Sequence, residues 1–316
     1  MHLNKYALLL PAALCMLLSG CTDIRSRLSP DLLAVDAGAR TALAAHSSQA
    51  GGLITAETSS PLLMPDALRI SSGAEISTGH LSLLIVSGQP GSVTAAYLQR
   101  GWLAPTCAVF AVPEDACGML ADGRIPAAEQ LQAAVSAGLL PCRTADAVTG
   151  DLLCGSGVTA FPSLDGGRLT LALCQGDALC GTLSQSACRG LALLGRRWDT
   201  FTFSADGAAC SVRRTRLKIG AAREDTRLHF TVTGTVCCET VSPDAAAAAC
   251  EEMLCAALTE TAQQAGADLC FLRENALRCG IGEAADCTPD AWQEMLRSAA
   301  YSAEITVTPA RFVQNI

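Results

Sequence analysis

Two long segments near the C-terminus restrict the fold more than any other feature of the sequence. Residues 210–220 (CSVRRTRLKIG) and 226–241 (TRLHFTVTGTVCCETV) alternate apolar and polar side chains, which is typical of a strand with one buried face. The apolar side chains that share one face of the second segment are Leu228, Phe230, Val232 and Val236. With a polar turn at residues 222–225, the pattern predicts an antiparallel hairpin whose apolar face another element must cover.

Helical patterns follow the hairpin and can supply that cover. Ser242 and Pro243 are typical of a helix start, and an apolar stripe with helical spacing continues from there to Gly266. Two further helices and a last strand are predicted over residues 268–278, 288–300 and 303–309. The order β-β-α-α-α-β predicts an α+β domain over residues 206–316.

Two further units are predicted ahead of this domain. Residues 80–112 have the pattern of a buried strand, a short helix and a second strand, which favours a parallel pair. The remaining predicted elements are a helix at 125–140, strands at 158–162 and 169–174, and a helix from Ser184 to about Leu194. We therefore predict a mixed α/β fold of three small domains, each with a β-sheet packed by helices. Their predicted ranges are 21–140, 141–205 and 206–316.

The segment after the first 21 residues has a weaker pattern. Residues 22–52 mix small and polar side chains and predict a tether, followed by a short strand at residues 53–55.

The leader, MHLNKYALLLPAALCMLLSGC, has the features of a secretory signal peptide. Lys5 supplies a basic flank, residues 6–18 are almost wholly apolar, and Ser19 and Gly20 are small residues of the kind accepted before a cleavage point. The apolar run is shorter than the roughly 20 residues that a membrane-spanning helix needs. The last four residues, Leu18-Ser19-Gly20-Cys21, are similar to a bacterial lipobox, in which the cysteine sulfur takes a diacylglycerol and the freed amino group is acylated.

This pattern predicts a lipid anchor. We expect a signal peptide over residues 1–20, cleavage between Gly20 and Cys21, and an N-palmitoyl, S-diacylglycerol cysteine at Cys21. Acyl chains of this kind would hold the protein to membrane lipid on the extracytoplasmic face. The alternative is an ordinary secreted protein whose first residue is a cysteine.

The charge and cysteine content exclude some functions. A formal net charge of −8 argues against nucleic acid as a partner. The chain has 17 cysteines, and setting aside Cys15 in the leader and Cys21 at the anchor leaves an odd number. Their spacing contains no C-x-x-C pair, so we expect most to be unpaired and packed as small hydrophobic residues, with a few disulfides as the alternative.

No catalytic or cofactor motif is complete. The glycine-rich stretch at residues 155–160 (GSGVTA) is followed by a proline and a turn where a dinucleotide site needs a helix, and the sequence has no phosphate-binding P-loop. The histidines of the mature chain, His46, His80 and His229, lie in different segments without metal-ligand spacing. We therefore expect no enzyme activity, no cofactor and no metal.

A basic run lies on the first strand of the predicted hairpin and consists of Arg213, Arg214, Arg216 and Lys218. We interpret it as a solvated strand face, with contact to anionic lipid head groups or an acidic partner as the alternative.

Four stretches, taken in order, resemble the Ger(x)C family, the lipoprotein C subunits of spore nutrient-germinant receptors. The leader end LLSGC with TDIRSRLSPDLLAVDAG resembles the family's lipidated opening, and ISTGHLSLLIVS with LQRGWLAPTCAVFAV resembles its first strand, helix and second strand. SGVTAFPSLDGGRLTLAL with CGTLSQSACRGLALLGRRW resembles its middle hairpin and helix. LKIGAAREDTRLHFTVTGTV with TAQQAGADLCFLREN resembles its C-terminal strand pair and helix junction. The chain differs at Thr22, where the family usually has Trp, and in its abundance of cysteine.

The resemblance implies a non-enzymatic lipoprotein on the outer face of the inner spore membrane. It also implies integral-membrane A and B receptor subunits as partners. Two alternative hypotheses assign the chain to other classes of protein. One is a solute-binding or other surface lipoprotein unrelated to germination, and the other is a secreted hydrolase with an unrecognised site.

Overall fold

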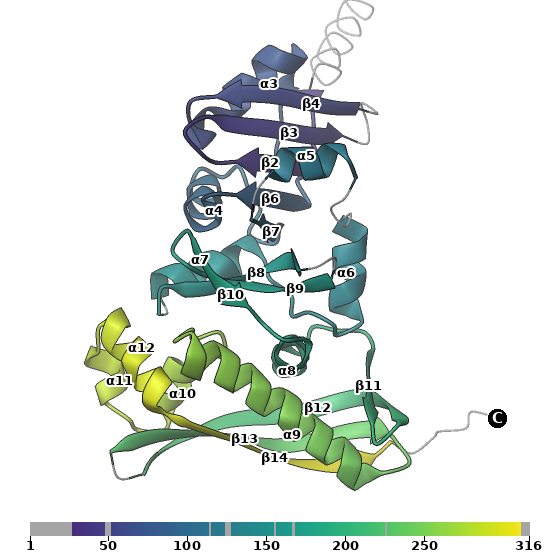
Figure 1. The fold of residues 1–316 in the computed structure, drawn as a ribbon, viewed down its shortest axis with the longest axis vertical. Helices are drawn as coiled ribbons and strands as arrows, with labels where there is room; N and C mark the ends of the chain where they lie inside the picture. The colour runs from purple at the N-terminus through teal and green to yellow at the C-terminus, as the bar shows by residue number, and fades with distance from the viewer. Residues whose placement is uncertain are drawn as a thin grey trace, which may run out of the picture.

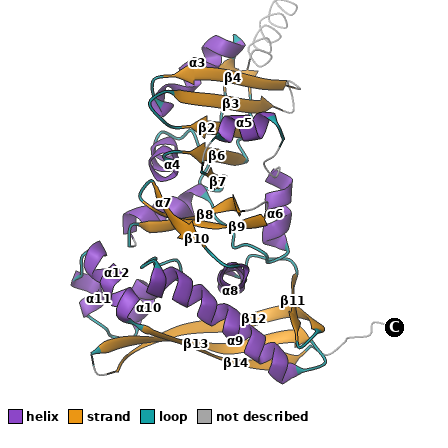
Figure 2. Ribbon diagram, in the orientation of Figure 1, coloured by secondary structure: helices purple, strands orange, loops and turns teal. Residues whose placement is uncertain are grey.

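The computed structural model describes residues 27–47, 52–113, 115–123, 128–154, 156–165, 168–224 and 226–310. Three β-sheets of five, three and four strands follow one another along the long axis of the molecule (Figure 1). Helices pack beside each sheet, which confirms the predicted mixed α+β fold (Figure 2). Among the described residues, no helix is both long and apolar enough to cross a membrane.

The N-terminal sheet has the strand order β4-β3-β2-β6-β7, in which β4, β3 and β2 are antiparallel while β2, β6 and β7 are parallel. Its strands are β2 (Leu32–Asp36), β3 (Thr41–Ser47), β4 (Gly52–Thr58), β6 (Leu83–Ser87) and β7 (Ala108–Val112). The parallel β6-α4-β7 unit, with α4 at Pro90–Gln99, confirms the prediction for residues 80–112.

The prediction of a tether over residues 22–52 is wrong for the part of this segment that the structure describes. Strand β2 lies at the centre of the five-stranded sheet, and β3 lies beside it. The interior residues of β2 are buried on both faces, so the strand lacks the polar–apolar alternation that marks a half-exposed strand. The strand predicted at residues 53–55 is present but longer, as β4.

Short elements surround this sheet, several of them in segments for which we predicted none. They are β1 (Arg27–Leu28) paired with β5 (Glu75–Ile76), a 3₁₀ turn at Pro61–Leu63, α3 (Met64–Ser72), α5 (Ala116–Ala121), α6 (Ala128–Ser136) and α7 (Ala145–Cys154). Of these, α6 corresponds to the helix predicted at residues 125–140 but ends earlier. The start of α5 is bound by Asp36, whose carboxylate accepts hydrogen bonds from the Ala116 amide at 2.5 Å and the Cys117 amide at 3.1 Å.

The middle sheet is an antiparallel meander followed by a helix. Its elements are β8 (Val158–Asp165), β9 (Arg168–Gln175), β10 (Ala178–Thr182) and α8 (Gln185–Gly195). Strands β8 and β9 and the helix were predicted, and the structure adds β10. Ser184 caps α8 as predicted, because its hydroxyl accepts a hydrogen bond from the Ala187 amide at 3.1 Å.

The C-terminal sheet has the order β11-β12-β13-β14. Its elements are β11 (Phe201–Ala205), β12 (Ala208–Glu224), β13 (Arg227–Glu239), α9 (Pro243–Leu258), a π-helix at Thr259–Gln264, α10 (Leu272–Arg278), α11 (Glu283–Asp286), α12 (Pro289–Ser298) and β14 (Ala300–Pro309). The predicted hairpin is confirmed, and its strands continue to the pair Glu224 and Arg227, closer to the turn than expected. The structure adds β11 and the short α11 to the predicted order. Since β11 pairs with β12, this sheet begins before residue 206.

Helices cover one face of this sheet (Figure 1). Phe230 of β13 is fully buried beneath Trp292 of α12, with their ring centroids 6.5 Å apart, and it stacks on Tyr301 of β14. The buried cluster that contains them continues through α8 and the middle sheet to Phe110 of β7. The three sheets therefore share a continuous apolar core, and the domain boundaries at residues 140 and 205 stay predictions.

Candidate functional site

A pocket lies where the middle unit meets the C-terminal unit of the described structure. It has a volume of about 700 Å³, within the range of roughly 300–1,000 Å³ that is common for small-molecule sites. Four segments form its walls: residues 140–147 before and within α7, the C-terminal half of α8, residues 217–219 of β12, and residues 269–279 around α10. We take this pocket as the candidate functional site.

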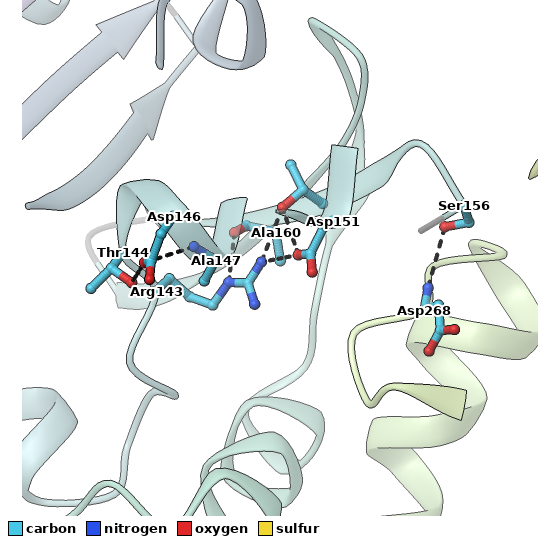
Figure 3. Close-up of polar contacts among 9 residues, drawn as sticks. Arg143, Thr144, Asp146, Ala147, Asp151, Ser156, Ala160 and Asp268 are labelled. Carbon is cyan, nitrogen blue, oxygen red and sulfur yellow. Dashed lines mark hydrogen bonds and ion pairs between the residues drawn. The ribbon is translucent and has the colours of Figure 1, made fainter. Parts of the chain in front are cut away.

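Arg143 is held at one wall of the pocket by an almost buried ion pair (Figure 3). Its guanidinium contacts the Asp151 carboxylate, and the two side chains are only 10% and 12% exposed. The Arg143 Nε donates to the Ala160 carbonyl at 3.1 Å and Nη2 donates to the Thr159 hydroxyl at 3.0 Å, which in turn donates to Asp151 at 2.8 Å. Because its partners fix the guanidinium plane, Arg143 is a rigid part of the wall.

A second polar cluster joins the middle unit to the helices of the C-terminal sheet. The Asp268 amide donates to the Ser156 hydroxyl at 3.2 Å, as Figure 3 shows. The Asp268 carboxylate is buried and accepts hydrogen bonds from the Leu272 amide at 2.6 Å, the Arg273 amide at 2.9 Å and the Trp292 indole at 3.0 Å. Burial raises the pKa of Asp268, while these hydrogen bonds oppose that rise. Asp268 therefore fixes the start of α10 at the edge of the pocket.

Phe271 precedes α10 in an unusual backbone conformation. Its φ of 56° and ψ of 39° lie in the left-handed region, where a bulky residue is rare, and its side chain is 65% exposed at the pocket. The helix predicted from residue 268 begins only at Leu272, because Asp268 acts as the acceptor for its first amides and Phe271 interrupts the helical backbone.

The side chains that line the pocket are suited to binding a ligand. Burial raises the pKa of the Cys270 thiol well above its usual value, with the nearby Asp268 and Asp151 carboxylates adding to the effect, so this pocket cysteine is mainly the neutral thiol near neutral pH. In the described ranges, no three His, Cys, Asp or Glu side chains are grouped so that they could hold a metal ion.

The predicted anchor, Cys21, and the cleavage point after Gly20 lie outside the described residues. The glycine-rich stretch leads directly into strand β8 and not into a helix, although Gly155 itself is not described. Sequence reasoning missed Arg143 and Phe271, which belong to no motif.

The predicted basic run lies on β12. Arg213 pairs with Glu239 at 2.7 Å, whereas Arg214, Arg216 and Lys218 are exposed and form no ion pair with a described carboxylate. This placement matches the solvated strand face that we expected.

His46, His80 and His229 lie apart from one another in the structure. His46 lies on β3, and His80 is exposed in a turn before β6. On β13, the ring of His229 lies 2.9 Å from both Glu224 and the Ser302 hydroxyl.

A solved structure, that of the GerBC protein, has a similar fold. The likeness covers 88% of this chain and 97% of that chain, with a TM-score of 0.54 and 13% sequence identity. No family model and no curated protein sequence matches this chain. At this identity the likeness concerns the fold, and the chain has a Ger(x)C-like fold.

Proposed function

We propose that this chain is a non-enzymatic lipoprotein subunit of a spore nutrient-germinant receptor, needed for the germination response. The observation that supports this most is the fold likeness to the GerBC protein, which spans nearly the whole of that chain. Three of the four stretches that resemble the Ger(x)C family form the kinds of element that the resemblance implies, namely β6-α4-β7, β8-β9 with α8, and β12-β13 with α10. Sequence motif order and three-dimensional fold thus point to the same group of proteins.

The proposed anchor gives the molecule an orientation. Cys21 lies six residues before Arg27, and a fully extended chain spans at most about 3.5 Å per residue, so the reach from lipid to β1 is at most about 20 Å. The five-stranded sheet would then stand near the outer face of the inner spore membrane. The four-stranded sheet, at the other end of the long axis, would face away from it (Figure 1).

We further propose that the protein acts by contact with the integral-membrane A and B subunits and does not itself catalyse a reaction. The test is isolation of the tagged chain from inner membranes of dormant spores, followed by identification of the proteins that accompany it. We expect the A and B subunits in amounts comparable to the tagged chain, and their loss when Cys21→Ala removes the anchor. Recovery of an ABC permease in their place would support the alternative of a solute-binding lipoprotein, which the pocket beside Arg143 favours.

A further inference from the structure

The lining of the pocket has a charge opposite to that of the protein as a whole. The chain carries 30 acidic residues against 22 basic ones, yet none of the lining residues is an Asp or Glu. The four basic residues of the lining are Arg143, Arg197, Lys218 and Arg278. Asp151 neutralises Arg143, and Glu274 lies 3.1 Å from Arg278.

Two of these cations lack a counterion within the part of the chain that the structure describes. Arg197, just after α8, and Lys218 of β12 are both exposed and form no ion pair with a described carboxylate. Because side chains alternate along a strand, Lys218 lies on the solvated face with Arg216, opposite Leu217 and Ile219, so Arg197 is the cation left to act at the pocket. An unpaired cation at a concave surface without acidic lining attracts an anion. The charge of the pocket therefore favours an anionic ligand over a neutral or cationic one.

The walls between these cations are mainly apolar. Leu191 and Leu194 of α8, Leu217 and Ile219 of β12, and Leu269 contribute to the lining. An apolar body that displaces water from such a surface gains free energy in proportion to the apolar area it covers. A ligand that uses the whole pocket is therefore amphipathic, with an apolar body and an anionic end.

The edge of β12 adds backbone hydrogen-bonding groups. From Arg214 onward this strand pairs with β13 on one side only. On the other side, the Leu217 carbonyl accepts from Arg196, and the Ala221 amide donates to the Cys279 sulfur at 3.4 Å. Ile219 lies between them with the same orientation, because alternate residues of an antiparallel strand direct their backbone groups to opposite sides. Its N–H and C=O therefore face the pocket and can bind a polar group of a ligand.

Phe271 gives an independent indication of a binding role. Holding a bulky residue at positive φ costs conformational free energy, and an exposed side chain returns little of that cost through burial. Strained, exposed residues of this kind are typical of ligand sites. We propose that this pocket binds a small amphipathic carboxylate, whose charged end lies near Arg197 and whose apolar body lies against α8 and Phe271.

The test is calorimetric titration of the full chain in mild detergent, with detergent alone as the blank, using three molecules of one shape. We expect saturable, one-to-one binding of 4-phenylbutyrate, binding at least several-fold weaker for the neutral 4-phenylbutanamide, and none detectable for the cationic 4-phenylbutylamine. Hexanoate distinguishes the source of the ligand: tighter binding than 4-phenylbutyrate indicates an acyl chain such as a lipid product, and weaker binding indicates a free aromatic acid.

Variants locate the site. Arg197→Gln should weaken 4-phenylbutyrate binding about two- to five-fold, the range for an exposed charge pair. Arg216→Gln, on β12 but outside the pocket lining, is the matched control and should leave binding unchanged. Phe271→Gly should weaken binding without loss of stability, since glycine adopts positive φ freely.

The outcomes decide the proposal separately from the receptor role, because binding is measured on the isolated chain. The proposal is overturned if no acid binds, if the amide binds as tightly as the acid, or if the Arg197 variant binds like the Arg216 control.

Discussion

Replacing Gly190 by alanine should destabilise the protein, because helices α8 and α9 cross at this residue without room for a side chain. A Cβ at Gly190 would lie 2.7 Å from the carbonyl carbon of Met253 and 2.8 Å from the Cβ of Ala257. The Met253 carbonyl oxygen lies closer still and would overlap the added Cβ. Ordinary contacts of a Cβ atom begin near 3.4 Å, so the two helices would have to separate by more than about 0.7 Å. The obstacle at Met253 is backbone, which cannot rotate away as a side chain can.

Two opposing contributions determine how much the free energy of unfolding changes in Gly190→Ala. Alanine stabilises a helix interior by about 1 kcal/mol relative to glycine. Overpacking of a closely packed core costs typically about 1–3 kcal/mol, and a backbone obstacle places this site at the upper end. The free energy of unfolding should therefore fall by about 1–2 kcal/mol in Gly190→Ala.

Gly195 offers a matched control on the same helix. A Cβ there meets no atom within 4 Å, so Gly195→Ala should raise the free energy of unfolding by up to about 1 kcal/mol. Urea denaturation followed by circular dichroism measures both variants against the parent. If Gly190→Ala were as stable as Gly195→Ala, the close crossing of α8 over α9 would be refuted.

Three further predictions concern a buried carboxylate, the thiols and the anchor. Since burial raises the pKa of Asp268, the stability that this group contributes is fully present below about pH 3.9, the usual unfolded value, and is lost as the pH rises through the native pKa. The unfolding free energy of the parent minus that of Asp268→Asn should therefore fall between pH 3.5 and pH 7 in urea titrations; an increase would contradict the direction of the shift. Iodoacetamide at pH 7.5 should label the exposed Cys180 and Cys279 before Cys174, whose pKa burial raises to about 12; equal labelling rates, measured by mass spectrometry, would disprove this. Cys21→Ala should leave an unprocessed or released protein in membrane fractionation with labelled fatty acid, and the lipobox interpretation fails if the variant stays membrane-bound while the parent takes up no label.

Burial also determines the protonation of the cysteines. The fourteen cysteines whose side chains the structure describes are free thiols, and half of them are buried. Burial raises the pKa of Cys107 and Cys250 to about 12 as well, which keeps them protonated and unreactive near neutral pH. The prediction that most cysteines pack as small hydrophobic residues is based on this burial. A count of free thiols in the denatured protein tests it.

Parts of the fold could be predicted because the sequence pattern there has one dominant period. In β12 and β13 one face is buried and the other is solvated, so alternation gave the strands, their pairing and the buried face with Phe230. Strands β2 and β3 could not be recognised in this way. Most of their residues are buried and many are alanines, which neither alternate nor favour a strand strongly.

The candidate site could not be predicted from sequence for a different reason. Its walls come from four segments between residues 140 and 279, and only the packing of the middle unit on the C-terminal unit brings them together. Arg143 is a single arginine after a proline and a cysteine, and its role depends on Asp151 and Thr159, which come from α7 and β8. The left-handed backbone at Phe271 could not be predicted from the residue type, because this conformation is usually adopted by glycine or asparagine.

The release of dipicolinic acid from spores that lack this gene tests the proposed receptor role most directly. The measurement uses a sporulating host with its other receptor operons removed, a panel of amino acids and sugars, and the parent gene restored as the control. We predict normal spore formation, slower release in response to at least one nutrient, and reduced or uncoupled A and B subunits. Unchanged release for every nutrient, together with unchanged levels of both subunits, would contradict the receptor role.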